Sequence, residues 1–197
     1  VNYWMHGSFL TFKGKKVSKS KGGLYTISEL EEKGFDPLSF RYLCLTTHYR
    51  KQLNFDLESL TAAQNSFKKL KELVLKVKEK KDSKGSLKKY QNKFIKEIND
   101  DLNSPKALAT LWEVIKDQNL GNKEKYELIL NFDKVLGLNL SKLKKEKISK
   151  EIKDLINKRE QARKEKDYKT ADKIRDQLNK KGIILEDTKE GITWKQI

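Results

Sequence analysis

Residues 56–77 read DLESLTAAQNSFKKLKELVLKV, a pattern that sets the architecture of most of the chain. Apolar side chains recur every three or four residues, so they would share one face of an α-helix, with lysines on the other. The Asp56 carboxylate is placed to accept a hydrogen bond from the first turn. We therefore predict a long amphipathic helix whose buried face carries Leu57, Leu60, Phe67, Leu70, Val74 and Val77.

Three more amphipathic segments follow this helix, after a polar break at residues 81–85. Ser104 and Pro105 open the second of them, and Gly137 ends the third. Four such helices with short connections predict an antiparallel helix bundle over residues 56–140. Its further core positions are expected to be Leu87, Tyr90, Phe94, Ile98, Leu108, Leu111, Trp112, Ile115, Tyr126, Ile129, Leu130 and Leu136.

Upstream of the bundle, residues 1–12 alternate apolar and polar positions and predict the last strand of a domain. A short helix is expected over residues 29–33, where Ser28 and Glu31 have the spacing of a capping box. Asp36 and Pro37 would begin the next helix, as N-cap and first helical position.

Downstream, the polar residues 139–148 predict a linker. Ser149 would cap a helix, and a second helix would follow a break near Asp167. The period then changes to that of strands, in residues 183–187 and 191–195, which predicts a β-hairpin. Residues 149–197 are thus expected to form a small α+β unit, and the fold class is mainly α.

The composition is strongly basic, with a formal net charge of +16 and 37% charged residues. Such a balance attracts polyanions, and RNA is the partner we expect. Lysine outnumbers arginine 39 to 5, so an AT-rich genome would also account for part of the charge. The single cysteine, Cys44, lies in an apolar run and is expected to be packed. No apolar run approaches 18 residues, so we expect a cytoplasmic protein with no membrane partner.

Residues 13–23 read KGKKVSKSKGG, a composition that favours binding of an anion such as phosphate. Glycines let the backbone approach a phosphate, serine hydroxyls donate hydrogen bonds, and lysines supply mobile positive charge. The alternative is a solvated lysine-rich loop or a localisation-type basic cluster. We call residues 13–23 the lysine–serine loop.

The core of this loop, Lys16-Val17-Ser18-Lys19-Ser20, resembles the KMSKS signature of class I aminoacyl-tRNA synthetases. Its flanks narrow the resemblance to cysteinyl-tRNA synthetases, which the chain resembles over essentially its whole length. The matching stretches are residues 3–6, 36–37, 40–42, 48–50 and 53–55. The resemblance implies the end of a Rossmann-type catalytic domain over residues 1–27, with the KMSKS-like loop, and a stem-contact connector over 28–55. Valine stands where that family usually has methionine.

The resemblance implies ATP with Mg as cofactor, and cysteine and tRNA(Cys) as substrates of a monomeric ligase. Lys19 would stabilise the departing pyrophosphate, with Lys16 second and Ser18 and Ser20 as donors. The family's HIGH-type motif and zinc ligands have no counterpart here, so the zinc site would precede Val1, and this chain alone should be inactive. His6 and His48 are expected to be structural or RNA-facing, and no metal ligand is assigned.

The tail resembles the anticodon-binding end of the same family. Tyr168 would stack on a base, Arg163 would donate hydrogen bonds, and Asp172 and Asp187 would accept them. Residues 142–181 also carry 16 Lys or Arg against 8 Asp or Glu, which favours contact with phosphates. The alternative is that Arg163 and Asp172 only pair with each other or with solvent and that Tyr168 and Trp194 are core residues.

Two competing functions remain open from the sequence. One is a non-catalytic basic RNA-binding protein, although binding alone does not need a loop of the KMSKS type. The other is a cysteine ligase with a small amine acceptor, which would not need the tail residues Arg163, Tyr168 and Asp187.

Overall fold

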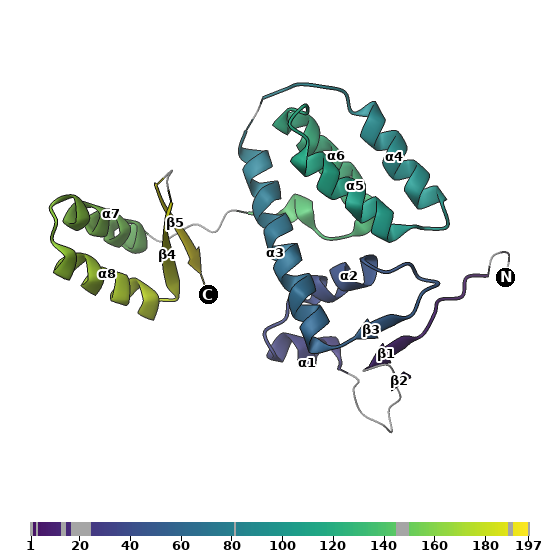
Figure 1. Ribbon diagram of the computed structural model, residues 1–197, viewed down its shortest axis with the longest axis horizontal. Helices are drawn as coiled ribbons and strands as arrows, with labels where there is room; N and C mark the ends of the chain where they lie inside the picture. Colours follow the sequence, from purple (N-terminus) through teal and green to yellow (C-terminus); the bar gives the residue numbers. More distant parts are fainter. Residues whose placement is uncertain are drawn as a thin grey trace. The chain divides into compact units, whose positions relative to one another are not determined.

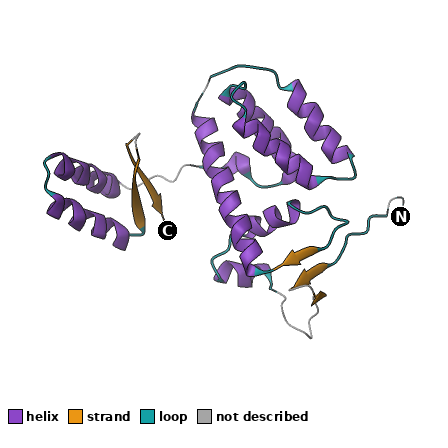
Figure 2. Cartoon of the chain, in the orientation of Figure 1, coloured by secondary structure: helices purple, strands orange, loops and turns teal. Residues whose placement is uncertain are grey.

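The chain divides into two compact units, Val1–Lys144 and Lys145–Ile197, which are described separately (Figure 1). Most of the regular structure is helical, as Figure 2 shows, so the predicted mainly α class is confirmed. The computed structural model describes residues 2, 4–12, 15–16, 25–80, 82–144, 150–188 and 191–196.

A small sheet lies at the start of the first unit, in the strand order β2-β1-β3. β1 (Leu10–Phe12) pairs antiparallel with β2 (Lys15–Lys16) and parallel with β3 (Leu53–Phe55). The prediction of one strand over residues 1–12 was wrong in extent, because residues 4–9 form no strand and Trp4, Met5 and Phe9 are exposed.

Two short helices connect this sheet to the longer ones. α1 (Ile27–Glu32) begins after Thr26, whose hydroxyl accepts a hydrogen bond from the Glu29 N–H at 3.2 Å while the Glu29 carboxylate accepts one from the Thr26 N–H at 2.7 Å. The capping box predicted at Ser28 and Glu31 was therefore wrong by two residues, because the helix starts earlier. α2 (Pro37–Leu45) begins as predicted, with Asp36 as N-cap.

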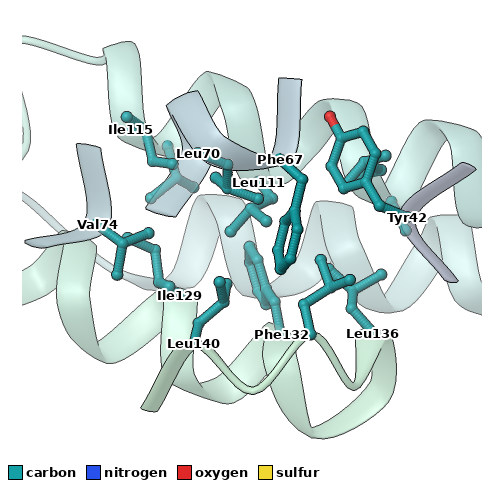
Figure 3. Packing of buried hydrophobic residues seen from close by; sticks show 14 of the residues in the cluster. Tyr42, Phe67, Leu70, Val74, Leu111, Ile115, Ile129, Phe132, Leu136 and Leu140 are labelled. Atoms are coloured by element: carbon teal, nitrogen blue, oxygen red, sulfur yellow. The ribbon is translucent and has the colours of Figure 1, made fainter. Parts of the chain in front are cut away.

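Four longer helices carry the main core: α3 (Leu57–Glu79), α4 (Lys88–Asn99), α5 (Ser104–Lys116) and α6 (Asn122–Leu136). α3 packs against α2, α5 and α6, and α4 packs against α5 and α6. Asp56 accepts a hydrogen bond from the Ser59 N–H at 2.6 Å, which confirms the predicted cap of α3. The fully buried side chains drawn in Figure 3 include Phe67, Leu70, Val74, Leu111, Ile129 and Phe132.

The end of α6 is a left-handed turn at Gly137, with φ +64°. Leu138 and Leu140 then return to the core, and a short 3₁₀ helix, η2 (Leu140–Lys142), follows. The Asp133 carboxylate accepts hydrogen bonds from the Leu138 and Leu140 N–H groups, each at 2.7 Å. The prediction that a linker starts at residue 139 was therefore wrong, because Leu140 is fully buried.

The second unit consists of a helical pair and a hairpin: α7 (Lys150–Lys164), α8 (Tyr168–Lys180), β4 (Ile183–Thr188) and β5 (Gly191–Gln196). Asp167 caps α8 by accepting a hydrogen bond from the Thr170 N–H, which confirms the predicted break. The antiparallel hairpin is also confirmed. Ile174, Leu178 and Ile183 form the core of this unit. Ser149 and the Trp194 side chain lie outside the described part.

Candidate functional site

The strands and aromatic side chains at the base of the lysine–serine loop are described, although most of the loop is not. Lys16 ends β2, where its backbone faces Thr11 of β1. Ser18, Lys19 and Ser20 lie outside the described residues. β1 is held on its other side by β3, where the Thr11 hydroxyl lies 3.4 Å from the Leu53 carbonyl oxygen. The strand that leads into the loop is therefore fixed on both edges.

Aromatic side chains bring the two ends of this segment together. The rings of Phe12, before the loop, and Tyr25, after it, have centroids 6.5 Å apart. Both also contact Phe55 of β3, at 6.4 and 6.2 Å, and Phe40 of α2 packs on Phe55 at 5.6 Å. Aromatic pairs at such distances add to the stabilisation from burial. Sequence reasoning missed this cluster; the aromatic residues on either side of the loop were the available signal.

A cavity of about 350 Å³ opens beside the sheet and α2. Its lining includes Ser8, Arg41, Cys44, His48 and Lys51. Cys44 is exposed, so the prediction that its thiol is packed was wrong. Desolvation by neighbouring atoms nevertheless raises the pKa of the Cys44 thiol, with Arg41 opposing the shift. The thiol is thus protonated at neutral pH, which argues against a nucleophilic role.

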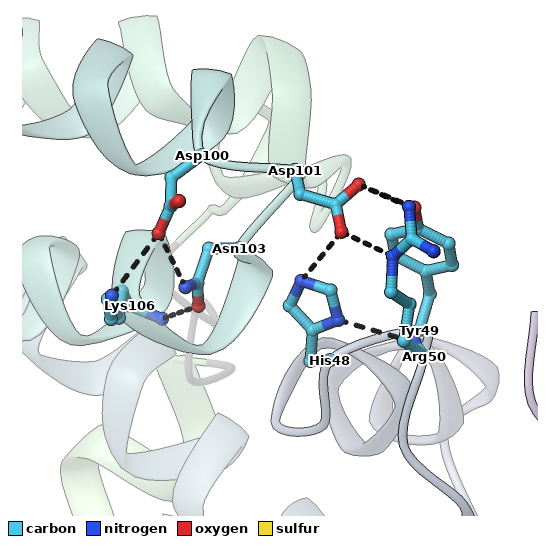
Figure 4. A network of polar contacts seen from close by, with 7 residues as sticks. All are labelled: His48, Tyr49, Arg50, Asp100, Asp101, Asn103 and Lys106. Carbon is cyan, nitrogen blue, oxygen red and sulfur yellow. Dashed lines mark hydrogen bonds and ion pairs between the residues drawn. The ribbon is translucent and has the colours of Figure 1, made fainter.

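Three consecutive residues, His48, Tyr49 and Arg50, meet Asp101 in a polar network (Figure 4). The Tyr49 hydroxyl and the Arg50 Nε each donate to a carboxylate oxygen at 2.5 Å, and Arg50 Nη2 donates at 3.2 Å. His48 Nε2 lies 3.8 Å from the same carboxylate. The hydrogen bonds from Arg50, and then from Tyr49, lower the pKa of Asp101 to about 2. Asp101 was not among the residues singled out from the sequence, because its partners lie some fifty positions away.

The turn between α4 and α5 presents Asp101. Asp101 and Leu102 both have left-handed backbones, with φ of 53° and 54°. The neighbouring Asp100 instead accepts hydrogen bonds from Asn103, in the same turn, and from Lys106, in the first turn of α5. These bonds lower the pKa of Asp100 as well. Two adjacent carboxylates therefore have different tasks, one local and one long-range.

Three of the four predicted RNA-binding residues of the second unit lie around the turn between α7 and α8. Arg163 is exposed in the last turn of α7. Tyr168 begins α8 with 61% of its surface exposed, so the alternative that Tyr168 is a core residue was wrong. Asp172 is exposed one turn later on the same helix face. Asp187 lies in β4 opposite Ile192, and its side chain is not described.

Two searches over the described part of the chain gave negative results. Within it, no three His, Cys, Asp or Glu side chains gather closely enough to hold a metal ion. None of the helices in that part combines the length and the apolar character needed to cross a bilayer.

Three family models match the chain in succession. Residues 1–65 match the class I (C) tRNA synthetase catalytic domain, residues 93–141 match the DALR domain, and residues 145–194 match the cysteinyl-tRNA ligase anticodon binding domain. The first match includes the lysine–serine loop, and the third includes Arg163, Tyr168, Asp172 and Asp187.

Similar curated proteins carry the name cysteine–tRNA ligase. The protein of Borrelia garinii subsp. bavariensis is 41% identical, over 98% of this chain and 45% of its own length. That of Leptospira interrogans is 36% identical, over 100% of this chain and 46% of its own length. That of Burkholderia lata is 40% identical, over 97% of this chain and 40% of its own length. The chain thus spans less than half the length of these relatives, and it belongs to the cysteinyl-tRNA synthetase family.

Proposed function

We propose that this chain supplies the ATP-phosphate loop and the tRNA-binding parts of a monomeric cysteine–tRNA ligase. That enzyme would activate cysteine with ATP and Mg and transfer it to tRNA(Cys). The observation that carries the proposal is the succession of catalytic, DALR and anticodon-binding matches, with the KVSKS sequence inside the first.

The proposal assigns a task to each part of the chain. Residues 1–27 would end a Rossmann-type catalytic domain with the KMSKS-like loop, and 28–55 would form the stem-contact connector. Residues 56–140 would form a tRNA-binding helix bundle, and 149–197 the anticodon module. The excess of lysine over acidic residues supports contact with RNA phosphates along the chain.

The loop would act on the adenylation step. When the cysteine carboxylate attacks the α-phosphate of ATP, negative charge accumulates on the departing pyrophosphate. Lys19, assisted by Lys16, Ser18 and Ser20, would stabilise that charge more in the transition state than in the ground state. The fixed strands and the aromatic contact between Phe12 and Tyr25 support this role, because they hold the base of the loop.

The test of the loop uses a polypeptide that also carries the part of the relatives that this chain does not match. We expect Lys19→Ala to lower the single-turnover rate of adenylate formation roughly a hundredfold, with little change in cysteine affinity. Lys68→Ala, an exposed lysine on α3, is the matched control and should leave the rate unchanged. An unchanged rate for Lys19→Ala would remove Lys19 from the mechanism.

The competing function, a non-catalytic RNA-binding protein, is favoured by the net charge of +16 alone. Cysteine-dependent exchange between ATP and pyrophosphate by the same complete polypeptide separates the two. The ligase shows this exchange, whereas a protein that only binds RNA does not.

The proposed anticodon contacts are tested by binding at fixed salt, because affinities for RNA depend on ionic strength. Tyr168→Ala should weaken tRNA binding by about 1–3 kcal/mol through loss of stacking. Asp172→Ala, Asp187→Ala and Arg163→Ala should reduce discrimination between cognate and anticodon-substituted tRNA. Asp176→Ala, another exposed carboxylate on α8, should not. If all three variants still discriminate fully between cognate and anticodon-substituted tRNA, these residues do not read the anticodon and the second unit has only a structural role.

A further inference from the structure

Residues 48–50 connect two distant parts of the first unit. On one side, their side chains bind the Asp101 carboxylate, through Tyr49 at 2.5 Å and through two nitrogens of Arg50 at 2.5 and 3.2 Å. On the other side, the Tyr49 carbonyl oxygen accepts a hydrogen bond from the Ser8 N–H at 2.8 Å. Ser8 lies two residues before β1. The same segment thus touches the α4–α5 turn and the approach to the sheet.

The segment itself is well ordered by local contacts. The His48 and Tyr49 rings stack at 5.0 Å, and the Arg50 guanidinium lies 5.2 Å from the centre of the Tyr49 ring. His48 Nδ1 accepts a hydrogen bond from the Arg50 N–H, and the His48 carbonyl from the Lys51 N–H. Exposed ion pairs contribute little in general, but a bidentate arginine within a network is the favourable case.

The backbone of the α4–α5 turn sets the direction of the Asp101 carboxylate. Left-handed backbone is unfavourable for residues other than glycine, and it persists where the surroundings fix it. Asp101 and Leu102 adopt it in succession where α4 ends, and the Leu102 N–H donates to the Ile98 carbonyl oxygen at 3.0 Å, which closes the helix. The same turn places the Asp101 carboxylate within hydrogen-bond distance of Tyr49 and Arg50.

From residues 48–50 the connection continues to the lysine–serine loop. The chain runs directly on into β3, whose Leu53 and Phe55 lie opposite Leu10 and Phe12 of β1. β1 ends at Phe12, and the loop begins at residue 13. We propose that Asp101 is a positioning residue that fixes β1, and with it the start of the loop, relative to α4 and α5. This inference rests on the proposed function only where it concerns catalysis.

The structural part of the inference is tested by amide hydrogen exchange on this chain. Asparagine tolerates left-handed backbone, so Asp101→Asn should keep the turn but remove the charge that binds Arg50. We expect amides at Ser8, Leu10–Phe12 and Leu53–Phe55 to exchange roughly fivefold faster. Asp100→Asn is the control, since Asp100 serves its own turn; it should affect only amides near the start of α5. Unchanged exchange in the strands of Asp101→Asn, or equal effects of both variants, would overturn the proposal.

The catalytic part is tested in the polypeptide that carries the complete enzyme. Asp101→Asn should lower kcat for aminoacylation about tenfold while KM for tRNA changes less than twofold, since the substitution removes no positive charge that could contact RNA phosphates. Arg50→Gln should lower kcat by the same factor, and the kcat of the double variant should be no lower than that of either single one. Because Arg50 lies in the proposed stem-contact connector, KM for tRNA is compared only for Asp101→Asn. A rise in KM alone, or additive losses, would contradict a positioning role. If the unmodified enzyme forms no cysteinyl-tRNA, the proposed function fails, while the exchange experiment still decides the role of Asp101 in the fold.

Discussion

The two units of the chain reach stability by different means. In the first, the core joins residues far apart in sequence; the Arg41 Nε, for example, donates to the Leu136 carbonyl oxygen, 95 positions away. In the second, each element packs on its neighbour in the chain, α7 on α8, α8 on β4 and β4 on β5. Among the described side chains, Ile174, Leu178 and Ile183 form the buried cluster there, against more than twenty residues in the first. The first unit should therefore be the more stable and the second the easier to predict.

The largest effect is expected from Phe132→Ala in the first unit. Phe132 is fully buried and its ring stacks on Phe94 at 4.0 Å, so truncation leaves a cavity and should cost about 3–5 kcal/mol. Urea unfolding followed by NMR signals from each unit measures the change. Val135→Ala, at an exposed position of the same helix, serves as control. If the NMR signals of folded Phe132→Ala disappear from both units at the same urea concentration, the two units do not differ in stability as proposed.

Leu178→Ala should have the next largest effect, of about 3 kcal/mol, because Leu178 is fully buried in the small core of the second unit. A unit of this size rarely has more than about 3–5 kcal/mol of stability. We therefore expect α7, α8 and the hairpin to unfold while the first unit keeps its unfolding midpoint. Gln177→Ala, at the exposed neighbouring position, should leave both units folded. A folded second unit in Leu178→Ala would mean that its core is larger than these residues.

Asp133→Asn should destabilise the first unit by about 1–3 kcal/mol. Asp133 accepts hydrogen bonds from two backbone N–H groups with its two carboxylate oxygens, and an amide would turn one acceptor into a donor. Hydrogen exchange at Leu138 and Leu140 would report the lost bond directly. Glu127→Gln, an exposed carboxylate of α6, provides the comparison. If these amides stay protected in Asp133→Asn, the carboxylate does not hold the segment.

The smallest expected effect is the dependence of stability on acidic pH that comes from Asp101. The Asp101 pKa is lowered from 3.8 to about 2 in the folded chain. Its contribution to stability is therefore complete above about pH 4 and is lost as pH falls through about 2. The difference in stability between the unmodified chain and Asp101→Asn should shrink over that window, and NMR titration of the Asp101 carboxyl carbon checks the pKa. A difference independent of pH between 4 and 2 would rule out the Asp101 charge as the cause.

The helices of both units could be predicted from the sequence because their signals are local. The caps at Asp36, Asp56 and Asp167 lie within a few residues of the helices they begin, and the apolar period marks the buried faces. The hairpin of the second unit pairs residues close in sequence, so the change to a strand period predicted it.

The features that were missed depend on partners far along the chain. β3 has only three residues, and it becomes a strand because it pairs with β1, some forty positions earlier. Leu140 was assigned to a linker because its neighbours are polar, but Asp133 and the core hold it. Asp101 matters through His48, Tyr49 and Arg50, which no local pattern connects to it. The proposal that the lysine–serine loop holds phosphate, in contrast, comes from residue types and stays a prediction.

The parallel pairing of β1 with β3 also bears on how the chain acquires its structure during synthesis. Phe12 lies opposite Phe55, so β1 is synthesised 43 residues before its partner strand is complete. At the usual rate of protein synthesis this delay is roughly 2–9 seconds. During that interval the lysine–serine loop has an incomplete sheet beneath it, and α1 and α2 are translated meanwhile. The pairing of β1 with β3, which holds the base of the loop, can therefore form only after residue 55 has been synthesised.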